Sequence, residues 1–369
     1  MTISEINDSA ENKFSALQRV RDIILAYGWN STSYQIINPG INHWFAARDD
    51  AVVGFVGGAG VRVAVGAPVC TENRLAEVAA EFEADAARTN ETVCYLAAES
   101  RLESINKQQK KYAAVLLGAQ PVWNPAKWRD IIAANKSLRA QLNRARNKGV
   151  KVSEWSTEKA RDNPLLNDCL EKWLDTKGLP PLAFMVEPRT LSRLFDRRVL
   201  VAKREREVVG FVLLSPVATR SGWLFEQFVH CPAAPNGTVE LMIDFTMRSL
   251  ADGNFDYATL GLAPLSTNAT VAPFRNPLWL RLLLEWARLH GRRFYNFDGL
   301  DAFKAKLKPE KWEPVFALTN EPHFSPRTIY AIAAAFSRNQ PFKLIFDGSR
   351  RALAIELNNL KRKFRKDAV

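Results

Sequence analysis

Apolar residues recur along the chain with two different periods, which predict alternating strands and helices. Residues 51–68 contain two short apolar stretches on either side of Gly57 and Gly58, a pattern that predicts two strands joined by a turn. Residues 72–88 show helical spacing of their apolar positions, and residues 92–98 form a further run typical of a strand. The first part of the chain is therefore predicted to hold a strand–helix–strand unit.

The same order recurs in the second half. Residues 198–217 predict a hairpin, residues 222–230 a third strand, residues 237–253 a helix and residues 255–262 the next strand. This order predicts an α/β fold with mixed sheets, built as two similar units in tandem. We place the first unit at residues 1–150, the second at residues 151–337 and a tail at residues 338–369.

A basic amphipathic helix is predicted where the two units join. Leu138, Leu142 and Ala145 follow helical spacing, and Gly149 is placed to end the helix. The other faces carry four basic residues, Lys136, Arg139, Arg144 and Arg146. They form either a solvated helix face or a track for a phosphate backbone.

Charge is spread unevenly along the chain. The net charge is +12, yet residues 1–120 hold 11 basic and 14 acidic residues. Residues 127–151 hold eight basic residues and one acid, and residues 338–369 hold nine basic residues and three acids. Clusters of this kind predict a polyanionic partner, either RNA or an anionic lipid surface.

The tail at residues 338–369 pairs an apolar stripe (Leu353, Leu357, Leu360 and Phe364) with a basic end. This pattern fits a helix lying on an anionic membrane surface, or a helix docked on its own domain with a disordered end. No apolar run approaches the ~18 residues of a membrane span, and the N-terminus resembles no signal peptide. We therefore expect a cytoplasmic protein, peripheral on the membrane, whose four dispersed cysteines are reduced core thiols.

Several motifs of catalytic chemistry are absent from the sequence. It contains no phosphate-binding loop, no HExxH, no GxSxG and no glycine-rich dinucleotide fingerprint. ATP hydrolysis, zinc catalysis and a serine triad are therefore not expected, and neither is a bound metal or cofactor.

The segment from residue 223 to 262 resembles the core of the GNAT acyltransferase fold in its order of strand, loop, helix and strand. In that superfamily the loop is usually glycine-rich, and its amides hold the pyrophosphate of acetyl-CoA at a helix N-terminus. Here the loop reads PAAPNGT, with two prolines and one glycine. The resemblance implies a GNAT-like fold without acetyl-CoA binding.

Five further segments resemble one family. They are WNSTSYQIINPG from residue 29, SLRAQLNRARNKGV from residue 137, PNGTVELM from residue 235, LGLAPLS from residue 260 and YNFDGLDAFKAKLKPEKWEPVF from residue 295. In this order they resemble the soluble catalytic domain of the aminoacyl-phosphatidylglycerol synthases, also called phosphatidylglycerol lysyltransferases or multiple peptide resistance factors. The resemblance implies two GNAT-like domains and transfer of an amino acid from aminoacyl-tRNA to a lipid hydroxyl. The family's usual N-terminal flippase is not found in this sequence, so a stand-alone soluble member is expected.

Transfer of this kind exchanges one ester for another, so it needs no nucleotide or metal. It does need stabilisation of an oxyanion and placement of the hydroxyl. On this interpretation Lys136, Arg139, Arg144 and Arg146 would contact tRNA, and an anionic lipid would be the second partner. The rivals are an aminoacyl- or N-acyltransferase acting on a peptide or small amine, and a non-catalytic RNA- or membrane-binding module. The amino acid and the accepting lipid are left open.

The densest group of candidate site residues lies between residues 296 and 316. Lys304, Lys306 and Lys308 stand near Asp298 and Trp312, and a helical turn there would place Lys304 and Lys308 on one face. Because residues two apart cannot share a helix face, at most one of Lys304 and Lys306 is expected to be catalytic. The other would bind phosphate or be solvated. Asp298 is expected at the C-terminal end of a strand, where sites of α/β sheets gather.

Further candidates lie around the predicted helix at residues 237–253. Asn236, Gly237 and Thr238 would cap this helix and could also face a substrate phosphate or oxyanion. Glu240, in the first turn, gains from the helix dipole in any case and could also bind the α-ammonium of the aminoacyl group. Glu226 and His230 are expected on one strand face with Leu224 and Phe228, and a structural, hydrogen-bonded Glu226 is favoured over a catalytic one.

Overall fold

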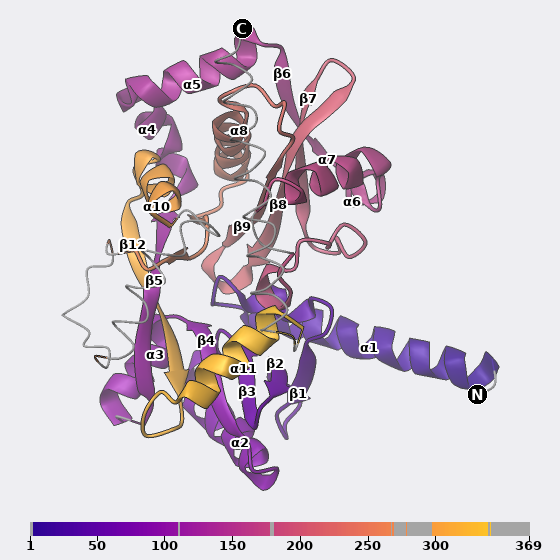
Figure 1. Ribbon diagram of the computed structural model, residues 1–369, viewed down its shortest axis with the longest axis vertical. Coiled ribbons are helices and arrows are strands. Elements are labelled where there is room, and N and C mark those ends of the chain that lie inside the picture. The colour runs from indigo at the N-terminus through magenta and orange to yellow at the C-terminus, as the bar shows by residue number, and fades with distance from the viewer. Residues whose placement is uncertain are drawn as a thin grey trace, which may run out of the picture.

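The computed structural model describes residues 3–109, 111–177, 181–266 and 297–338, together with residues 268, 278 and 340. Twelve strands of this part form one continuous sheet (Figure 1). Its order is β1 (Asn42–Phe45), β2 (Val52–Gly58), β3 (Val61–Val65), β4 (Thr92–Ala98), β12 (Lys311–Thr319), β5 (Ala113–Trp123), β10 (Tyr257–Thr259), β9 (Gly222–His230), β8 (Glu207–Val217), β7 (Arg198–Arg204) and β6 (Val150–Trp155). The twelfth strand, β11 (Ala263–Pro264), pairs with β5 beside this path.

Two strand pairs in this sheet are parallel, β3 with β4 and β9 with β10, and each pair is joined by a helix. Helix α2 (Leu75–Arg88) connects the first pair and α8 (Thr238–Asp252) the second. A parallel pair needs such a crossover, whereas the antiparallel neighbours do not. The predicted fold class, α/β with mixed sheets and a GNAT-like core, is confirmed.

Two local predictions need correction. Gly57 and Gly58 lie inside β2, and the turn falls at Ala59 and Gly60, whose φ angles are +53° and +71°. Strand β10 ends at Thr259, earlier than predicted, because Gly261 adopts a φ of +68° and turns the chain. Residues 263–264 then pair with β5 instead.

Strand β12 connects the two halves of the sheet. It comes from the second predicted unit, yet it lies between β4 and β5 of the first. Strand β5 in turn pairs with β10 of the second unit. The boundaries at residues 150 and 337 stay predictions.

Helices cover both faces of each half of the sheet (Figure 1). In the first half, α1 (Ile3–Tyr27) and α11 (Pro326–Phe336) pack on one face, and α2 packs on the other beside α3 (Ser100–Gln109). In the second half, α8, α4 (Trp128–Ala134) and α5 (Lys136–Asn147) cover one face and α7 (Pro164–Leu174) the other. The short α6 (Thr157–Ala160) precedes α7, and α10 (Phe297–Lys306) precedes β12. No helix in the described ranges is both long and apolar enough to cross a bilayer.

Helix α5 is the basic helix predicted at the junction. It buries Leu138, Leu142 and Ala145 as expected, and Gly149 follows it with a φ of +79°. The predicted tail at residues 338–369 lies almost entirely outside the described residues.

Candidate active site

Lys304 lies in the last turn of α10, and it is only 3% exposed. Its Nζ donates to the carbonyl oxygens of Leu260, Gly261 and Leu262 at 2.9, 2.8 and 2.9 Å. Burial lowers the pKa of Lys304 to about 7, and the charge of Asp301 opposes this shift. An ammonium has three N–H donors, so every donor of the charged form has a partner and the carbonyls favour that form.

The three carbonyls belong to the turn that ends β10. Thr259 Oγ1 accepts from Gly261 N–H at 3.1 Å and donates to the Pro121 carbonyl at 2.8 Å, which ties the turn to β5. A side chain at Gly261 would adopt a strained positive φ, and its Cβ would lie 3.2 Å from a methyl carbon of Leu224. The fold therefore brings the segment at residues 260–266 against α10.

Lys306, two residues further on, has a different neighbour. Its Nζ lies 3.0 Å from Oε1 of Glu240, in the first turn of α8. The side chains are 31% and 13% exposed, so the pair is reachable from solvent. Asn135 Nδ2 donates to the Lys306 carbonyl at 3.2 Å, while Asn135 Oδ1 caps α5 by accepting from Leu138 N–H. The N-termini of α5 and α8 and the C-terminus of α10 thus meet around Lys306.

The N-terminus of α8 packs closely against α5. Gly237 is its cap residue with a φ of +92°, and a Cβ there would lie 2.2 Å from the Gln141 carbonyl oxygen. Thr238 is buried and donates its hydroxyl to the Pro235 carbonyl, whereas Asn236 is exposed. These residues open the helix as predicted, with Gly237 as the cap residue and no side-chain capping bond.

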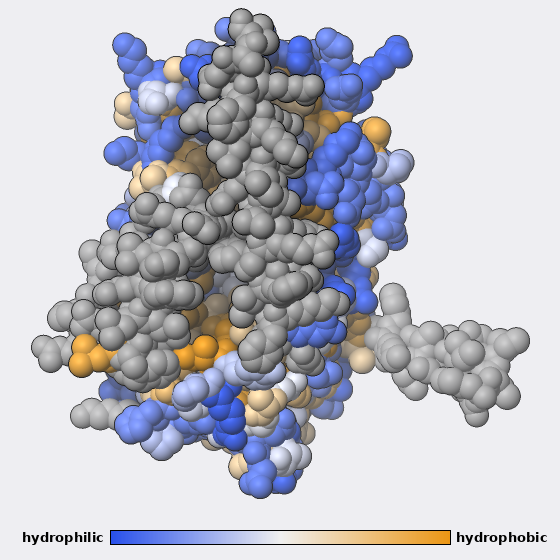
Figure 2. Space-filling model, viewed as in Figure 1, coloured by the Kyte–Doolittle hydropathy of each residue, from blue (hydrophilic) through white to orange (hydrophobic). Residues whose placement is uncertain are grey.

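All four basic residues predicted on α5 are exposed. Figure 2 shows hydrophilic side chains at the end of the molecule where α5 lies in Figure 1. Two of them bind groups on other helices: Arg139 donates to the carbonyls of Ile132 and Ala133 at the end of α4, and Arg146 pairs with buried Asp244 at 2.9 Å. Lys136 and Arg144 make no ion pair within the described residues. Helix α5 therefore presents positive charge beside the Lys306–Glu240 pair.

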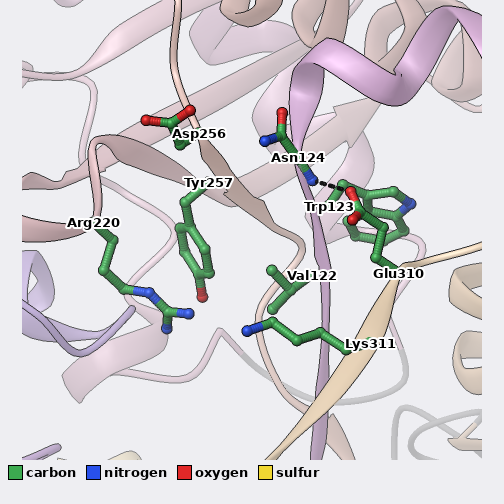
Figure 3. A pocket seen from close by; sticks show the side chains of 8 residues that line it. All are labelled: Val122, Trp123, Asn124, Arg220, Asp256, Tyr257, Glu310 and Lys311. Atoms are coloured by element: carbon green, nitrogen blue, oxygen red, sulfur yellow. Dashed lines mark hydrogen bonds between the residues drawn. The ribbon is translucent and has the colours of Figure 1, made fainter.

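A cavity of about 470 Å³ opens where β5, β10 and β12 meet (Figure 3). Its lining comprises Val122, Trp123, Asn124, Arg220, Asp256, Tyr257, Glu310 and Lys311. In Figure 3 the side chains of Arg220 and Lys311 reach toward Tyr257 from opposite sides. Charges of both signs line this cavity, so it suits a polar ligand better than an apolar one.

A buried network of charges lies beside the cavity. The Arg220 guanidinium lies 3.6 Å from the centre of the Tyr257 ring, and it donates to Glu313 at 2.9 and 2.6 Å and to Glu99 at 3.3 Å. The Ser31 N–H donates to Glu99 at 2.6 Å. Burial raises the pKa of Glu99 to about 7, and the charge of Arg220 opposes this shift.

Sequence reasoning did not find this network. Its members come from separate segments, and each is an ordinary residue in its local pattern. Two of its members, Ser31 and Glu313, lie in segments that resemble the family, residues 29–40 and 295–316, whereas Glu99 and Arg220 lie in none of the five segments.

The family model for phosphatidylglycerol lysyltransferase, C-terminal, matches residues 21–319. The chain belongs to this family.

Two solved structures are similar to this member of the lysyltransferase family over nearly their whole length. One is the C-terminal domain of a putative lysylphosphatidylglycerol synthetase from Agrobacterium fabrum, with a TM-score of 0.74 and 19% identity, covering 88% of this chain and 97% of that one. The other is L-PGS from Bacillus licheniformis, with a TM-score of 0.72 and 18% identity, covering 87% and 96%. FemX is similar at a TM-score of 0.53 and 9% identity, covering 86% and 98%. At these identities the likeness shows the fold alone.

A search of curated proteins found no match. Within the described residues of this lysyltransferase-family chain, no group of three or more His, Cys, Asp or Glu side chains could hold a metal ion. The expected absence of metal and cofactor stays a prediction.

Glu226 has a structural partner in this family member. Arg197, itself buried, donates to both of its carboxylate oxygens at 2.7 and 2.9 Å, so Glu226 is hydrogen-bonded as expected, and its role stays a prediction. The predicted shared face is wrong, because β9 carries a bulge at this point that breaks the alternation. Phe225 and Phe228 stack on each other instead. His230 is half-buried, and burial lowers its pKa.

Two other predicted site residues are placed differently from the expectation. Lys308 follows α10 with a φ of +54° and is exposed, so it shares no helix face with Lys304. Asp298 lies in the first turn of α10, although it was expected just after a strand, and the residues of that strand before Phe297 lie outside the described part. Trp312 is half-buried on β12, where its backbone pairs with Pro121.

Proposed function

We propose that this lysyltransferase-family protein transfers an amino acid from aminoacyl-tRNA to a hydroxyl group of a membrane lipid. The single observation that carries the proposal is the meeting of α5, α8 and α10 around the Lys306–Glu240 pair, in a chain whose family is named for lysyl transfer to phosphatidylglycerol. Phosphatidylglycerol or a similar lipid is the acceptor that this name supports.

The reaction begins when the lipid hydroxyl attacks the carbonyl carbon of the aminoacyl ester. The tetrahedral intermediate bears an oxyanion, and collapse of this intermediate breaks the bond to the tRNA ribose oxygen. One proton passes from the lipid hydroxyl to that leaving oxygen, so the reaction is balanced without a nucleotide. Stabilising the oxyanion and positioning the hydroxyl are the tasks left to the protein.

The two lysines suit different parts of this work. Lys306 is partly exposed beside Glu240, so its ammonium is available to the oxyanion or to a substrate phosphate while Glu240 binds the α-ammonium of the aminoacyl group. Lys304 has all its donors on the carbonyls of residues 260–262, which suits it to hold that turn in place.

The basic face of α5 supports tRNA as the donor. Its exposed residues flank the lysine–glutamate pair, so phosphates of an acceptor stem bound along α5 would bring the aminoacyl end to Lys306. Helix α5 also packs on the N-terminus of α8 at Gly237, which supports the expectation that acetyl-CoA is not the donor. Peripheral binding on the cytoplasmic face of the membrane is part of the same proposal.

The direct test uses purified chain, tRNA charged with a radiolabelled amino acid, and vesicles containing phosphatidylglycerol. Label appearing in the organic-solvent extract, and mass spectrometry of the labelled lipid, would support the proposal and identify the acceptor. Label that passes only to a peptide or small amine would favour an aminoacyltransferase of another class. Binding of tRNA and vesicles without any transfer would favour a non-catalytic module.

A further inference from the structure

Cys169 and Cys231 are 62 positions apart in the sequence, but their sulfur atoms lie 2.8 Å apart. Cys169 is fully buried on α7. Cys231 directly follows β9 and is half-buried, so one thiol of the pair is reachable from solvent.

The backbone holds both cysteines in place. Helix α7 packs on β8 and β9 through Leu166 and Leu170, which belong to one core cluster with Phe211 and Val229. The Cys231 N–H donates to the Val209 carbonyl at 3.0 Å, which fixes the end of β9 against β8. The contact between the sulfur atoms is therefore a property of the packed core and not of one freely rotating side chain.

The other two cysteines provide a comparison within the same chain. Cys70 and Cys94 are both buried, and they belong to two different core clusters of the first half of the sheet. Within the described residues, neither thiol is hydrogen-bonded to another sulfur.

We propose that Cys169 and Cys231 are an oxidation site that forms a reversible disulfide with hydrogen peroxide as oxidant. The Cys231 thiolate attacks the peroxide, which yields a sulfenic acid on Cys231 and releases hydroxide. The Cys169 sulfur then attacks the sulfenic sulfur and displaces its oxygen, which leaves as water with the thiol proton. In sum, two thiols lose two electrons and two protons, and one peroxide becomes two waters.

Exposure assigns the order of the two steps. Peroxide reaches the half-buried Cys231 first. Burial and the hydrogen bond with Cys231 raise the pKa of the Cys169 thiol, which disfavours Cys169 as the first nucleophile. Cys169 resolves the sulfenic acid because its sulfur is already in contact.

The disulfide would need a shift of less than 1 Å, from 2.8 Å to a bond length of about 2.05 Å. It would fasten the start of the loop at residues 231–237 to α7. This loop leads to the N-terminus of α8, where Glu240 pairs with Lys306. Because it closes a long segment of chain, the bond should also raise the thermal midpoint of unfolding.

The experiment uses the full chain, reduced and then exposed to hydrogen peroxide, with glutathione in a parallel tube to show that the oxidant is active. After quenching, free thiols are alkylated under denaturing conditions, and intact mass and peptide mapping follow. We expect a loss of two hydrogens, one Cys169–Cys231 cross-linked peptide, a raised thermal midpoint and full reversal by dithiothreitol. Cys70 and Cys94 should remain free thiols and should both be alkylated.

Cys231→Ser, at the half-exposed position, is the matched variant. It should fold, form no cross-link and show no peroxide-dependent rise of the thermal midpoint. Cys169→Ser should accumulate a sulfenic acid on Cys231 that dimedone traps. The proposal is overturned if the parent chain keeps all its thiols alkylatable while glutathione oxidises, or if the cross-link joins other cysteines. None of these measurements depends on aminoacyl transfer, so the result is separate from the fate of the proposed function.

Discussion

Lys306 and Lys304 lie two positions apart in α10, and their different surroundings lead to different expectations for their removal. Lys306→Ala should lower lipid aminoacylation by about 10²-fold, the cost of losing one oxyanion donor. Its effect on the free energy of unfolding should be within about 1 kcal/mol, because the ion pair with Glu240 is partly exposed. Transfer from charged tRNA to phosphatidylglycerol vesicles, measured beside a urea titration, checks both values.

Lys304→Met should act on stability as well as on activity. Methionine keeps most of the side-chain volume, but the carbonyls of Leu260, Gly261 and Leu262 lose their donor inside the protein. A buried acceptor left unpaired costs about 1–3 kcal/mol, so the free energy of unfolding should fall by at least that amount. Because Lys304 is buried and Lys306 is partly exposed, only the replacement of Lys306 should leave the free energy of unfolding nearly unchanged. Full activity of both variants would contradict a catalytic role for either lysine.

The sequence identified these residues but not their partners. The run of lysines at residues 304–308 is visible in the sequence, whereas the acceptors of Lys304 are backbone carbonyls, which no side-chain pattern reveals. Glu226 was expected to be hydrogen-bonded, yet its partner Arg197 could not be named, because the two come together only when β7 and β9 share a sheet. The pairing of Glu240 with Lys306 joins residues 66 positions apart and was missed for the same reason.

At the scale of elements, α5 predicts a measurable salt dependence of tRNA binding. Lys136→Ala combined with Arg144→Ala should weaken binding and lower the slope of log affinity against log salt by somewhat less than 2, if both residues meet phosphates. Arg146 is left intact because it pairs with buried Asp244. Filter binding between low and moderate salt measures the slope.

The control for α5 removes the same charge elsewhere. Arg88 and Lys107 are 76% and 65% exposed in the first half of the chain, so replacing both with Ala changes net charge equally. That control should leave the slope near the parent value. Equal slopes for the α5 variant and the parent would contradict a role of this helix in tRNA binding.

The basic tail predicts a second contact, with the membrane. Deleting residues 347–369 should weaken co-sedimentation with anionic liposomes, because each Lys or Arg near such a surface contributes about 1 kcal/mol. Circular dichroism of the shortened chain should match the parent. Unchanged binding to liposomes would remove the tail from the membrane contact.

The elements were predictable where their signals are local. The apolar periods of α2, α5 and α8 and of the β7–β8 hairpin all lie within short windows of sequence, and each of these elements forms as expected. The bulge in β9 depends on pairing with β8, and the short strand at residues 263–264 depends on pairing with β5. Those partners lie outside any short window, so periodicity could not find either feature.

At the scale of the whole molecule, the two halves share one sheet, and their charges meet at its centre. Glu99 follows β4, Glu313 lies on β12, and Arg220 arrives from the turn before β9. Strand β12 could not be placed between β4 and β5 from sequence, because a strand's neighbours are set by the topology of the whole chain and not by its own composition. The charge network follows from the placement of β12, so the sequence could not predict the network either.

The network of Glu99, Arg220 and Glu313 predicts that the free energy of unfolding depends on pH through Glu99. Burial raises the pKa of Glu99 in the folded state to about 7, from the ordinary glutamate value of 4.5, so the folded state binds a proton more tightly than the unfolded chain does. The stabilising contribution of the neutral carboxyl is complete below about pH 4.5 and is lost as the pH rises through about 7, by on the order of 3 kcal/mol.

Glu99→Gln keeps a neutral group of similar shape and removes this titration, while Arg220 retains Glu313. The free energy of unfolding of the parent minus that of the variant, from urea titrations at pH 4.5 to 8, should therefore fall with rising pH. Taking this difference cancels other titrating groups, including Lys304, whose lowered pKa gives the opposite slope above pH 7. A difference that stays flat across that range would show that the proton affinity of Glu99 does not change when the two halves of the sheet come together.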